Sequence, residues 1–339
     1  MLERLLSSSV VLAGLLTLQQ PARDQVLLSE LRAIAASTTG TLGVRVVQVE
    51  SGRGASLNGD DWFPMMSVYK LPIAIHTLRL AERATLDLDE RVTLTADDRR
   101  SGSSPLAQTI ALKGPQALTI RELLSSVIRI SDNTASDRLL RIAGGPPAVQ
   151  QTLTALRVHG VNVNRYELEF AADYYGICCV GKVTPFSLER FIGQIEAVRP
   201  AERRKAAAAF LGDRRDSATP DGLAELMVRL TRGEILNPAN TSWLLDEMAE
   251  MHTRDTRLRA GLPPGTRASL RPGTSGETDG IRAAHHDTAI VRLPDGRGHV
   301  VIVTFLKGSK GPDATRDRVL ARVGHTAYQW GVSADGPRH

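Results

Sequence analysis

The chain has 339 residues, of which 42% are hydrophobic and 4% aromatic, and its formal net charge is +5 at pH 7. This length is sufficient for one large domain or for two lobes that share a substantial core. Because basic residues are scattered among nearly as many acidic ones and aromatic residues are few, we expect no nucleic-acid partner, which would require a basic stripe or a stacking platform.

The N-terminus has the pattern of a secretory signal. Arg4 precedes the apolar run from Val10 to Leu18, and Gln19-Gln20-Pro21-Ala22 follows it. This pattern predicts a signal peptide over residues 1–22, and therefore an exported protein that is periplasmic or secreted. The alternative is a frayed amphipathic helix. The run is too short to cross a bilayer and no other segment is long enough, so we expect no stable membrane span.

Hydrophobic periodicity predicts an α+β chain. Strands are expected at residues 42–49, 55–57, 284–293 and 300–305, and helices at 24–36, 67–83, 119–128, 134–142, 148–156, 185–195, 201–210, 220–230, 237–251 and 313–330. Because the strands lie near both ends, they predict one antiparallel sheet formed from both termini and flanked by helices. Residues 24–62 and 258–335 would form this α/β lobe, and residues 63–257 an all-helical second lobe.

A serine and a lysine lie three residues apart at the start of the helix that begins at Ser67. Residues at this spacing share one face of a helix, so the Ser67 hydroxyl and the Lys70 amine are expected to meet. A lysine whose pKa is lowered by burial can take the proton of a serine nucleophile, and the free N–H groups of a helix start can stabilise an oxyanion. Pro72 is expected to bend the first turns. The alternative is an ordinary helix entry.

Two more short motifs follow in the same order as in a known family. Ser67-x-x-Lys70 is followed by Ser131-Asp132-Asn133 and then by Arg271-Pro272-Gly273. With their flanking residues, these motifs resemble those of class A β-lactamases and penicillin-binding proteins over roughly Leu27 to Trp330. The resemblance implies an active site between the two lobes, a small-molecule β-lactam substrate, no cofactor and no metal.

The resemblance also implies a role for each motif residue. Ser67 would attack the lactam carbonyl, Lys70 would take or relay its proton, and Ser131 would pass a proton to the leaving nitrogen. The backbone N–H groups of Ser67 and Thr274 would hold the oxyanion. Asn133 would bind the amide of the acyl side chain, the alternative for Asn133 being a helix cap.

Deacylation in the family depends on a glutamate in a loop, acting through a water molecule. Glu167 takes that place within Arg165-Tyr166-Glu167-Leu168-Glu169, with Glu169 as a weaker rival. An ion pair between Arg165 and Asp216 would pin the ends of this loop. We expect a long extended loop over residues 165–216, with an insertion at 171–212 as a surplus over the family.

Several residues depart from the family pattern. Arg271 replaces a lysine and is expected to bind the substrate carboxylate bidentately. Pro272 lacks the hydroxyl that usually helps there, and Ser275 is expected to replace it in part. Ala171 stands where the family has an asparagine that helps to hold the deacylating water, so these changes are expected to affect turnover more than acylation.

Two remaining clusters point to no separate site. The adjacent Cys178 and Cys179 would form only a strained disulfide and supply too few ligands for zinc, so we expect free or buried thiols. In His285-His286-Asp287, neighbouring side chains point to opposite faces of a strand, which favours structural or surface roles over a metal site.

Three functions therefore compete. The leading hypothesis is an exported, monomeric serine β-lactamase. The second is a penicillin-binding-like serine hydrolase that deacylates slowly. The third is a non-catalytic scaffold that uses the insertion at 171–212 to bind a partner.

Overall fold

The computed structural model describes residues 22–178, 180, 185–251 and 256–333. The expected signal peptide therefore lies outside the described residues except for Ala22, and Cys179 also lies outside them. None of the helices in the described ranges combines the length and apolar character required to span a bilayer.

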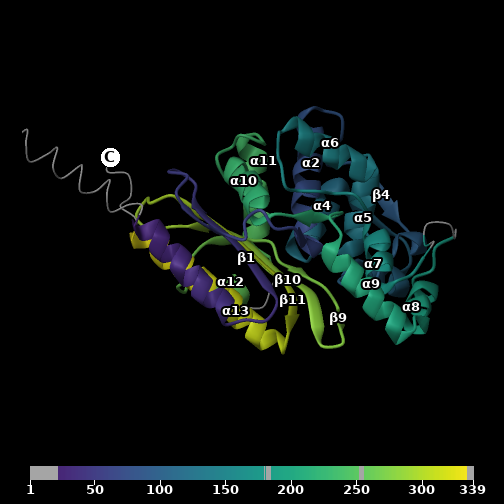
Figure 1. The fold of residues 1–339 in the computed structure, drawn as a ribbon. Helices are drawn as coiled ribbons and strands as arrows, with labels where there is room; N and C mark the ends of the chain where they lie inside the picture. The colour runs from purple at the N-terminus through teal and green to yellow at the C-terminus, as the bar shows by residue number, and fades with distance from the viewer. Residues whose placement is uncertain (1–21, 179, 181–184, 252–255, 334–339) are drawn as a thin grey trace, which may run out of the picture.

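A seven-stranded antiparallel sheet forms one side of the molecule (Figure 1). Its strands are β1 (Thr41–Gln48), β2 (Gly54–Leu57), β7 (Ala268–Leu270), β8 (Gly273–Thr274), β9 (Glu277–Thr278), β10 (Ile281–Arg292) and β11 (His299–Lys310). Their order is β2-β1-β11-β10-β7, and β8 and β9 pair with β10. Because β1 pairs with β11 along its whole length, the two ends of the chain are joined in one sheet. The predicted α+β fold is thereby confirmed.

Helices from both ends of the chain cover one face of the sheet. A helix over residues 22–36 lies beside α13 (Asp313–Ser333), as Figure 1 shows in purple and yellow. Leu31 of the first helix and Leu320 of α13 are fully buried in a cluster with Val44 and Ile302 of the sheet. The short helix α12 (Arg257–Ala260) packs against α13.

The other face of the sheet meets the helical part of the chain. This part contains α2 (Lys70–Glu82), α3 (Pro105–Lys113), α4 (Ile120–Arg129), α5 (Asn133–Ile142), α6 (Gly145–Ala155), α7 (Glu167–Tyr175), α8 (Leu188–Ala197), α9 (Pro200–Gly212), α10 (Pro220–Thr231) and α11 (Pro238–Ala249). It also contains η1 (Met66–Tyr69), η2 (Ala96–Asp98), β3 (Phe63–Pro64), β4 (Arg91–Leu94), β5 (Gln116–Thr119) and β6 (Ser217–Ala218).

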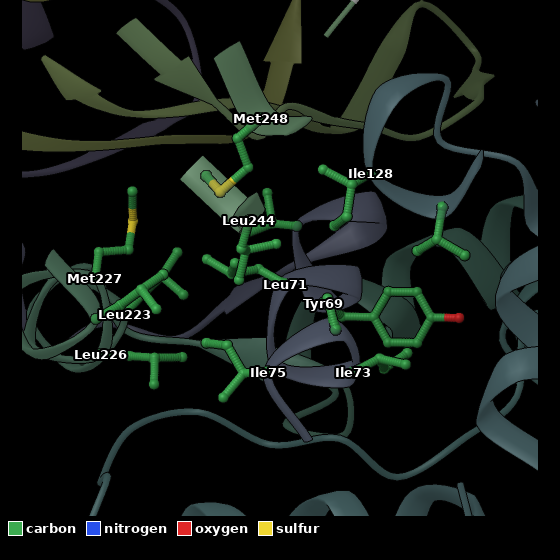
Figure 2. Close-up of a cluster of buried hydrophobic side chains, with 14 of the residues drawn as sticks. Tyr69, Leu71, Ile73, Ile75, Ile128, Leu223, Leu226, Met227, Leu244 and Met248 are labelled. Atoms are coloured by element: carbon green, nitrogen blue, oxygen red, sulfur yellow. The ribbon is translucent and has the colours of Figure 1, made fainter. Parts of the chain in front are cut away.

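Helix α2 is the centre of this part. Its residues from Lys70 to Leu78 are all buried, so it has no solvent-exposed face over two turns. Figure 2 shows Leu71 and Ile75 of α2 among side chains of the neighbouring helices, with Leu223 and Leu244 close by. A helix fixed on every side provides a rigid base for the residues at its N-terminus.

Local signals account for the elements that the sequence predicts correctly. The predicted capping box is present, because Thr119 accepts a hydrogen bond from the Glu122 N–H and Glu122 accepts one from the Thr119 N–H. Helix α6 begins at Gly145 rather than after Pro147, since proline is tolerated in the first turn of a helix. Within the long segment 165–216, α8 and α9 correspond to the helices expected at 185–195 and 201–210, whereas the periodicity of the sequence does not predict α7.

Candidate active site

The Ser67 side chain lies at the N-terminal end of the central helix. Ser67 belongs to the 3₁₀ turn η1, which leads directly into α2 at Lys70. The turn is entered through Met66, whose φ of 49° is in the left-handed region, a strained conformation that is concentrated at functional sites. Because no side chain caps η1, the first N–H groups of the turn, including that of Ser67, remain available to an anion.

The Lys70 ammonium lies at the centre of the site. Its Nζ atom is 3.4 Å from Ser67 Oγ, 3.2 Å from Ser131 Oγ and 2.6 Å from Asn133 Oδ1. It also donates to the Ser131 carbonyl at 2.8 Å and lies 3.1 Å from Glu167 Oε1. The structure therefore places the three other residues expected to be catalytic, Ser67, Ser131 and Glu167, around the buried amine of Lys70.

Burial sets the electrostatics of this cluster. Desolvation lowers the pKa of Lys70, and Arg271 lowers it further, while Glu167 acts in the opposite direction. Desolvation raises the pKa of Glu167, although the Lys70 ammonium acts against this rise. Both groups are therefore shifted toward their neutral forms, which makes a proton easier to move between them.

Arg271 occupies a position that differs from its expected role. Its side chain is fully buried, and it donates to the carbonyls of Ser67, Val127 and Ile128 and to Ser131 Oγ. These bonds use four of its five N–H groups, so a bidentate grip on a substrate carboxylate is not available. The expectation of bidentate binding is wrong. The guanidinium, whose pKa burial lowers to about 10, instead holds the hydroxyl of Ser131 at 2.7 Å.

The register of β8 places one backbone N–H in the cleft. Arg271 exchanges two hydrogen bonds with Thr288, and the Ser275 N–H donates to the Ala284 carbonyl. Hydrogen-bonded positions alternate along an antiparallel strand, so Thr274, which is paired with His285, directs its N–H away from β10. Gly273 keeps β8 close to the nucleophile's turn, because a Cβ atom there would lie 2.5 Å from the Met65 carbonyl oxygen.

Ser275 does not supply the missing hydroxyl. Its Oγ donates to the Gly276 carbonyl and accepts a bond from the Ala284 N–H. Since a hydroxyl has a single proton to donate, none remains for a carboxylate. The prediction that Ser275 replaces the hydroxyl lost at Pro272 is therefore wrong.

Two acidic side chains position the segment that carries Glu167. Asp216 accepts from Arg165 Nε at 2.6 Å, which joins the two ends of the segment as expected. Asp137, buried on α5, accepts from the Glu167 N–H at 2.6 Å and fixes the first residue of α7. Ala171 lies one turn further along α7 and faces the same pocket as Glu167.

The Ser-Asp-Asn motif divides its roles among its members. Asp132 is the N-cap of α5, where it accepts from the Ala135 N–H, and it also accepts from the Leu106 N–H. Asn133 donates to the Ser101 carbonyl while its oxygen faces Lys70. Ser131 is held at a φ of 57°, again in the left-handed region. The capping alternative therefore belongs to Asp132, whereas Asn133 lines the cleft.

Ser67 lies where two halves of one cleft meet. One half, of about 250 Å³, is bounded by α7, α8 and β8; the other, of about 400 Å³, is bounded by α12, β8, β10 and α13. Ser67, Ser103 and Thr274 line both halves.

The second half contains residues that sequence reasoning missed. Arg257 donates to Thr274 Oγ1 at 2.7 Å and to the His286 carbonyl at 2.7 Å. Asp317 of α13 lies 3.4 Å from the Arg257 guanidinium and 2.7 Å from His285 Nε2. The sequence signal for this group is weak, because its members come from four elements, α12, β8, β10 and α13, and only the fold brings them together.

The adjacent histidines have different surroundings, as strand geometry predicts. His286 Nε2 donates to the Pro64 carbonyl and its Nδ1 accepts from the Leu306 N–H, so the ring is neutral. His285 contacts Asp317 instead. Among the described residues, no group of three His, Cys, Asp or Glu side chains is arranged to hold a metal ion. Cys178 is an exposed free thiol.

The sheet, the helical part and the Ser67–Lys70–Ser131 cluster define a serine hydrolase of the β-lactamase type. The family model for the beta-lactamase enzyme family matches residues 27–330. The chain belongs to this family, and the expected class A assignment is confirmed.

Individual members of the family align with this chain over most of their length. The extended-spectrum beta-lactamase PER-1 of Pseudomonas aeruginosa is 26% identical over 96% of this chain and 93% of its own. Beta-lactamase L2 of Stenotrophomonas maltophilia is 29% identical over 88% of this chain and 84% of its own. The crystal structure of a beta-lactamase from Chitinophaga pinensis superposes with a TM-score of 0.73 at 28% identity, covering 89% of this chain and 98% of that one. These matches do not favour a non-catalytic scaffold or a slow penicillin-binding-like hydrolase.

Proposed function

We propose that Ser67 opens the lactam ring of β-lactams and becomes acylated, with Lys70 as the base that takes its proton. The observation that carries this proposal is the position of Lys70 Nζ, 3.4 Å from Ser67 Oγ and 3.2 Å from Ser131 Oγ. Because burial and Arg271 lower the pKa of Lys70, its neutral form is more accessible than that of an exposed lysine. As the carbonyl becomes tetrahedral, the N–H groups of Ser67 and Thr274 stabilise its oxyanion.

Proton delivery to the leaving nitrogen falls to Ser131. Its hydroxyl accepts from Arg271 Nη2 and from Lys70 Nζ, so two cations face its oxygen. Two cations at this distance stabilise the alkoxide that forms when Ser131 gives up its proton, and Lys70 is placed to replace that proton. Arg271 thus acts on the reaction through Ser131. This role replaces the contact with the substrate carboxylate that we expected of Arg271.

Deacylation is assigned to Glu167. Its carboxylate lies 3.1 Å from Lys70 Nζ and lines the same half of the cleft as Ser67, and its raised pKa makes it a stronger base than an exposed glutamate. It would take a proton from a water molecule that attacks the acyl-enzyme carbonyl. Asn133 lines the same half of the cleft and is assigned the amide of the acyl side chain.

The carboxylate of the substrate is assigned to Arg257. This guanidinium lines the second half of the cleft together with Ser67, Pro272 and Thr274, so it carries positive charge next to the site of attack. Asp317 holds it in place without covering it, since Arg257 remains a wall of the cleft. Arg257 would therefore supply the contact that Arg271 and Ser275 do not make.

The enzyme is proposed to act outside the cytoplasm, as the pattern of residues 1–22 indicates, and to act as a monomer. All the residues assigned to the reaction come from a single chain, so the cleft needs no second copy. The substrate is a small β-lactam, and no nucleic acid and no cofactor take part.

A single-turnover assay with a chromogenic cephalosporin, followed by absorbance and by intact-protein mass, tests this function. Steady hydrolysis that is lost in Ser67→Ala would support it. A stoichiometric burst and a persistent mass adduct in the unmodified protein would show slow deacylation instead. Absence of both hydrolysis and adduct would overturn the proposal.

A further inference from the structure

The helices inserted after Glu167 form a wall of the active-site cleft. In the half of the cleft bounded by α7 and α8, the apolar side chains belong to these two helices and to the turn before Ser67. The lining side chains contributed by α7 and α8 are Glu167, Phe170, Ala171, Tyr174, Tyr175 and Ile195. Glu167 is the only charged group among them, and Lys70 already pairs with it. This half of the cleft is therefore suited to an apolar group.

Helix α9 supports the aromatic part of this wall from behind. The Phe210 ring of α9 packs edge-on against the rings of Phe170 and Tyr174, with distances between ring centroids of 5.0 Å and 5.2 Å. All three side chains are buried. Helix α7 ends against α9 at Gly176, where a Cβ atom would lie 3.1 Å from Ala206 Cβ. The wall is therefore held by packing between helices.

The wall closes against the segment that joins β8 to β9, two short strands that both pair with β10. A Cβ atom added at Gly276 would lie 3.1 Å from Tyr174 Cε1 and 3.4 Å from the Tyr175 hydroxyl. The two tyrosine rings pack edge to face, with centroids 5.0 Å apart. The far end of this half is consequently narrow, and the whole half has a volume of only about 250 Å³.

The geometry points to a specificity role for the insertion: Tyr175 and Ile195 select β-lactams with a flat aromatic acyl group over those with a branched oxyimino group. A flat ring can lie against the aromatic wall with favourable edge or offset contacts. A branched group needs width in two directions, which the approach of Tyr174 and Tyr175 to Gly276 does not leave. This inference rests on the proposed function and deepens it by naming the substrate class.

Cephalothin and cefotaxime provide a matched pair, since they share the cephalosporin nucleus and its acetoxymethyl group and differ in the acyl side chain. We expect kcat/KM of the unmodified enzyme to be at least about a hundredfold higher for cephalothin. Tyr175→Ala and Ile195→Ala should each reduce this ratio by about tenfold, because they remove wall contacts with the ring and widen the subsite. Ile192→Ala is the matched control, since Ile192 lies on the same helix but is 41% exposed, and it should leave the ratio unchanged.

Equilibrium binding separates this inference from the proposed function. Binding of the two cephalosporins to Ser67→Ala, measured by calorimetry, should show the same preference for cephalothin, and adding Ile195→Ala should reduce that preference. If neither compound acylates Ser67, the proposed function fails, and the ratio of dissociation constants still tests the subsite. Equal kcat/KM values, a ratio that neither variant moves, or no preference in binding would each overturn the inference.

Discussion

The Nζ atom of Lys70 lies 3.1 Å from Oε1 of Glu167, and both side chains are buried. The ion pair joins the group assigned to acylation with the group assigned to deacylation. Because burial shifts the pKa of each toward the neutral form, the same pair can hold one proton in two places during the reaction. The position of Glu167 is thus coupled to that of the nucleophile's base, although 97 residues of sequence separate them.

Glu167→Gln should leave acylation largely intact and stop turnover. The amide keeps the shape of the side chain but cannot take a proton from water, so kcat should fall by about a hundredfold or more. Intact-protein mass should then show an accumulated adduct on Ser67. Glu169→Gln is the control, since Glu169 is exposed and, in the part of the chain that the structure describes, accepts a single hydrogen bond, from the Tyr166 N–H. An unaltered kcat in Glu167→Gln would remove Glu167 from the mechanism.

On the acidic side of the pH profile, kcat should fall with a midpoint above the usual pKa of a glutamate. Deacylation needs ionised Glu167, and burial raises its pKa from the ordinary value of 4.5. The value of kcat should therefore fall as pH decreases through a midpoint higher than 4.5, under conditions in which deacylation limits the rate. Circular dichroism at each pH checks that the fold persists. A midpoint at or below 4.5 would contradict the assignment.

Arg271→Lys restores the residue that the family usually has, yet it should weaken this protein. Nη1 of Arg271 donates to the buried carbonyls of Val127 and Ile128, and a lysine cannot reach both. Leaving buried acceptors unpaired should reduce the free energy of unfolding by about 1–3 kcal/mol, as measured by urea denaturation.

Acylation should also slow in Arg271→Lys, because the hydroxyl of Ser131 loses its contact with Nη2. Arg267→Lys is a suitable control, since Arg267 pairs with Asp246 on the surface and its side chain is 57% exposed. Equal stability of Arg271→Lys and Arg267→Lys would show that the carbonyl contacts contribute little.

Local sequence accounts well for the half of the site that lies on α2 and α5. The spacing of Ser67 and Lys70 follows from helix geometry alone, and Asp132 caps α5 as its residue type suggests. The antiparallel sheet also follows from strands at both ends of the chain. In each case, the decisive contacts lie within a few residues or follow from one simple pattern.

The remaining features depend on contacts that no local pattern encodes. Nothing near Arg271 reveals that Val127 and Ile128 present their carbonyls to it, and a family pattern suggests a substrate contact instead. Arg257 reaches the cleft because α12 packs between β10 and α13. Helix α7 was missed because its buried aromatic residues, Phe170 and Tyr174, acquire their partners from the distant α9.

Arg257→Ala should weaken binding of substrates that carry a carboxylate. Loss of a hydrogen bond to a charged group costs about 1.5–3 kcal/mol, so kcat/KM should fall by roughly ten- to a hundredfold, mainly through KM. The methyl ester of the same cephalosporin is the control, because it lacks the charge and should be hydrolysed equally by both proteins. An equal loss for acid and ester would assign Arg257 a structural role instead.

Acidification should destabilise the protein through His286. Burial lowers the pKa of this ring to about 3, whereas the unfolded chain binds the proton with a pKa of 6.5. The unfolded state therefore takes up more protons as pH falls below 6.5, and stability decreases until the pH reaches about 3. At pH 5 the contribution amounts to about 2 kcal/mol. His285, whose pKa burial lowers to about 4, acts in the same direction.

Urea denaturation at pH 7 and pH 5 measures this effect, with His286→Phe as the comparison. The variant loses the bonds to the Pro64 carbonyl and the Leu306 N–H, so it should be less stable at pH 7. Its ring still fits between Phe63 and Phe305 but binds no proton. On acidification, it should therefore lose about 2 kcal/mol less than the unmodified protein. An equal loss in both proteins would show that His286 is not a source of acid sensitivity.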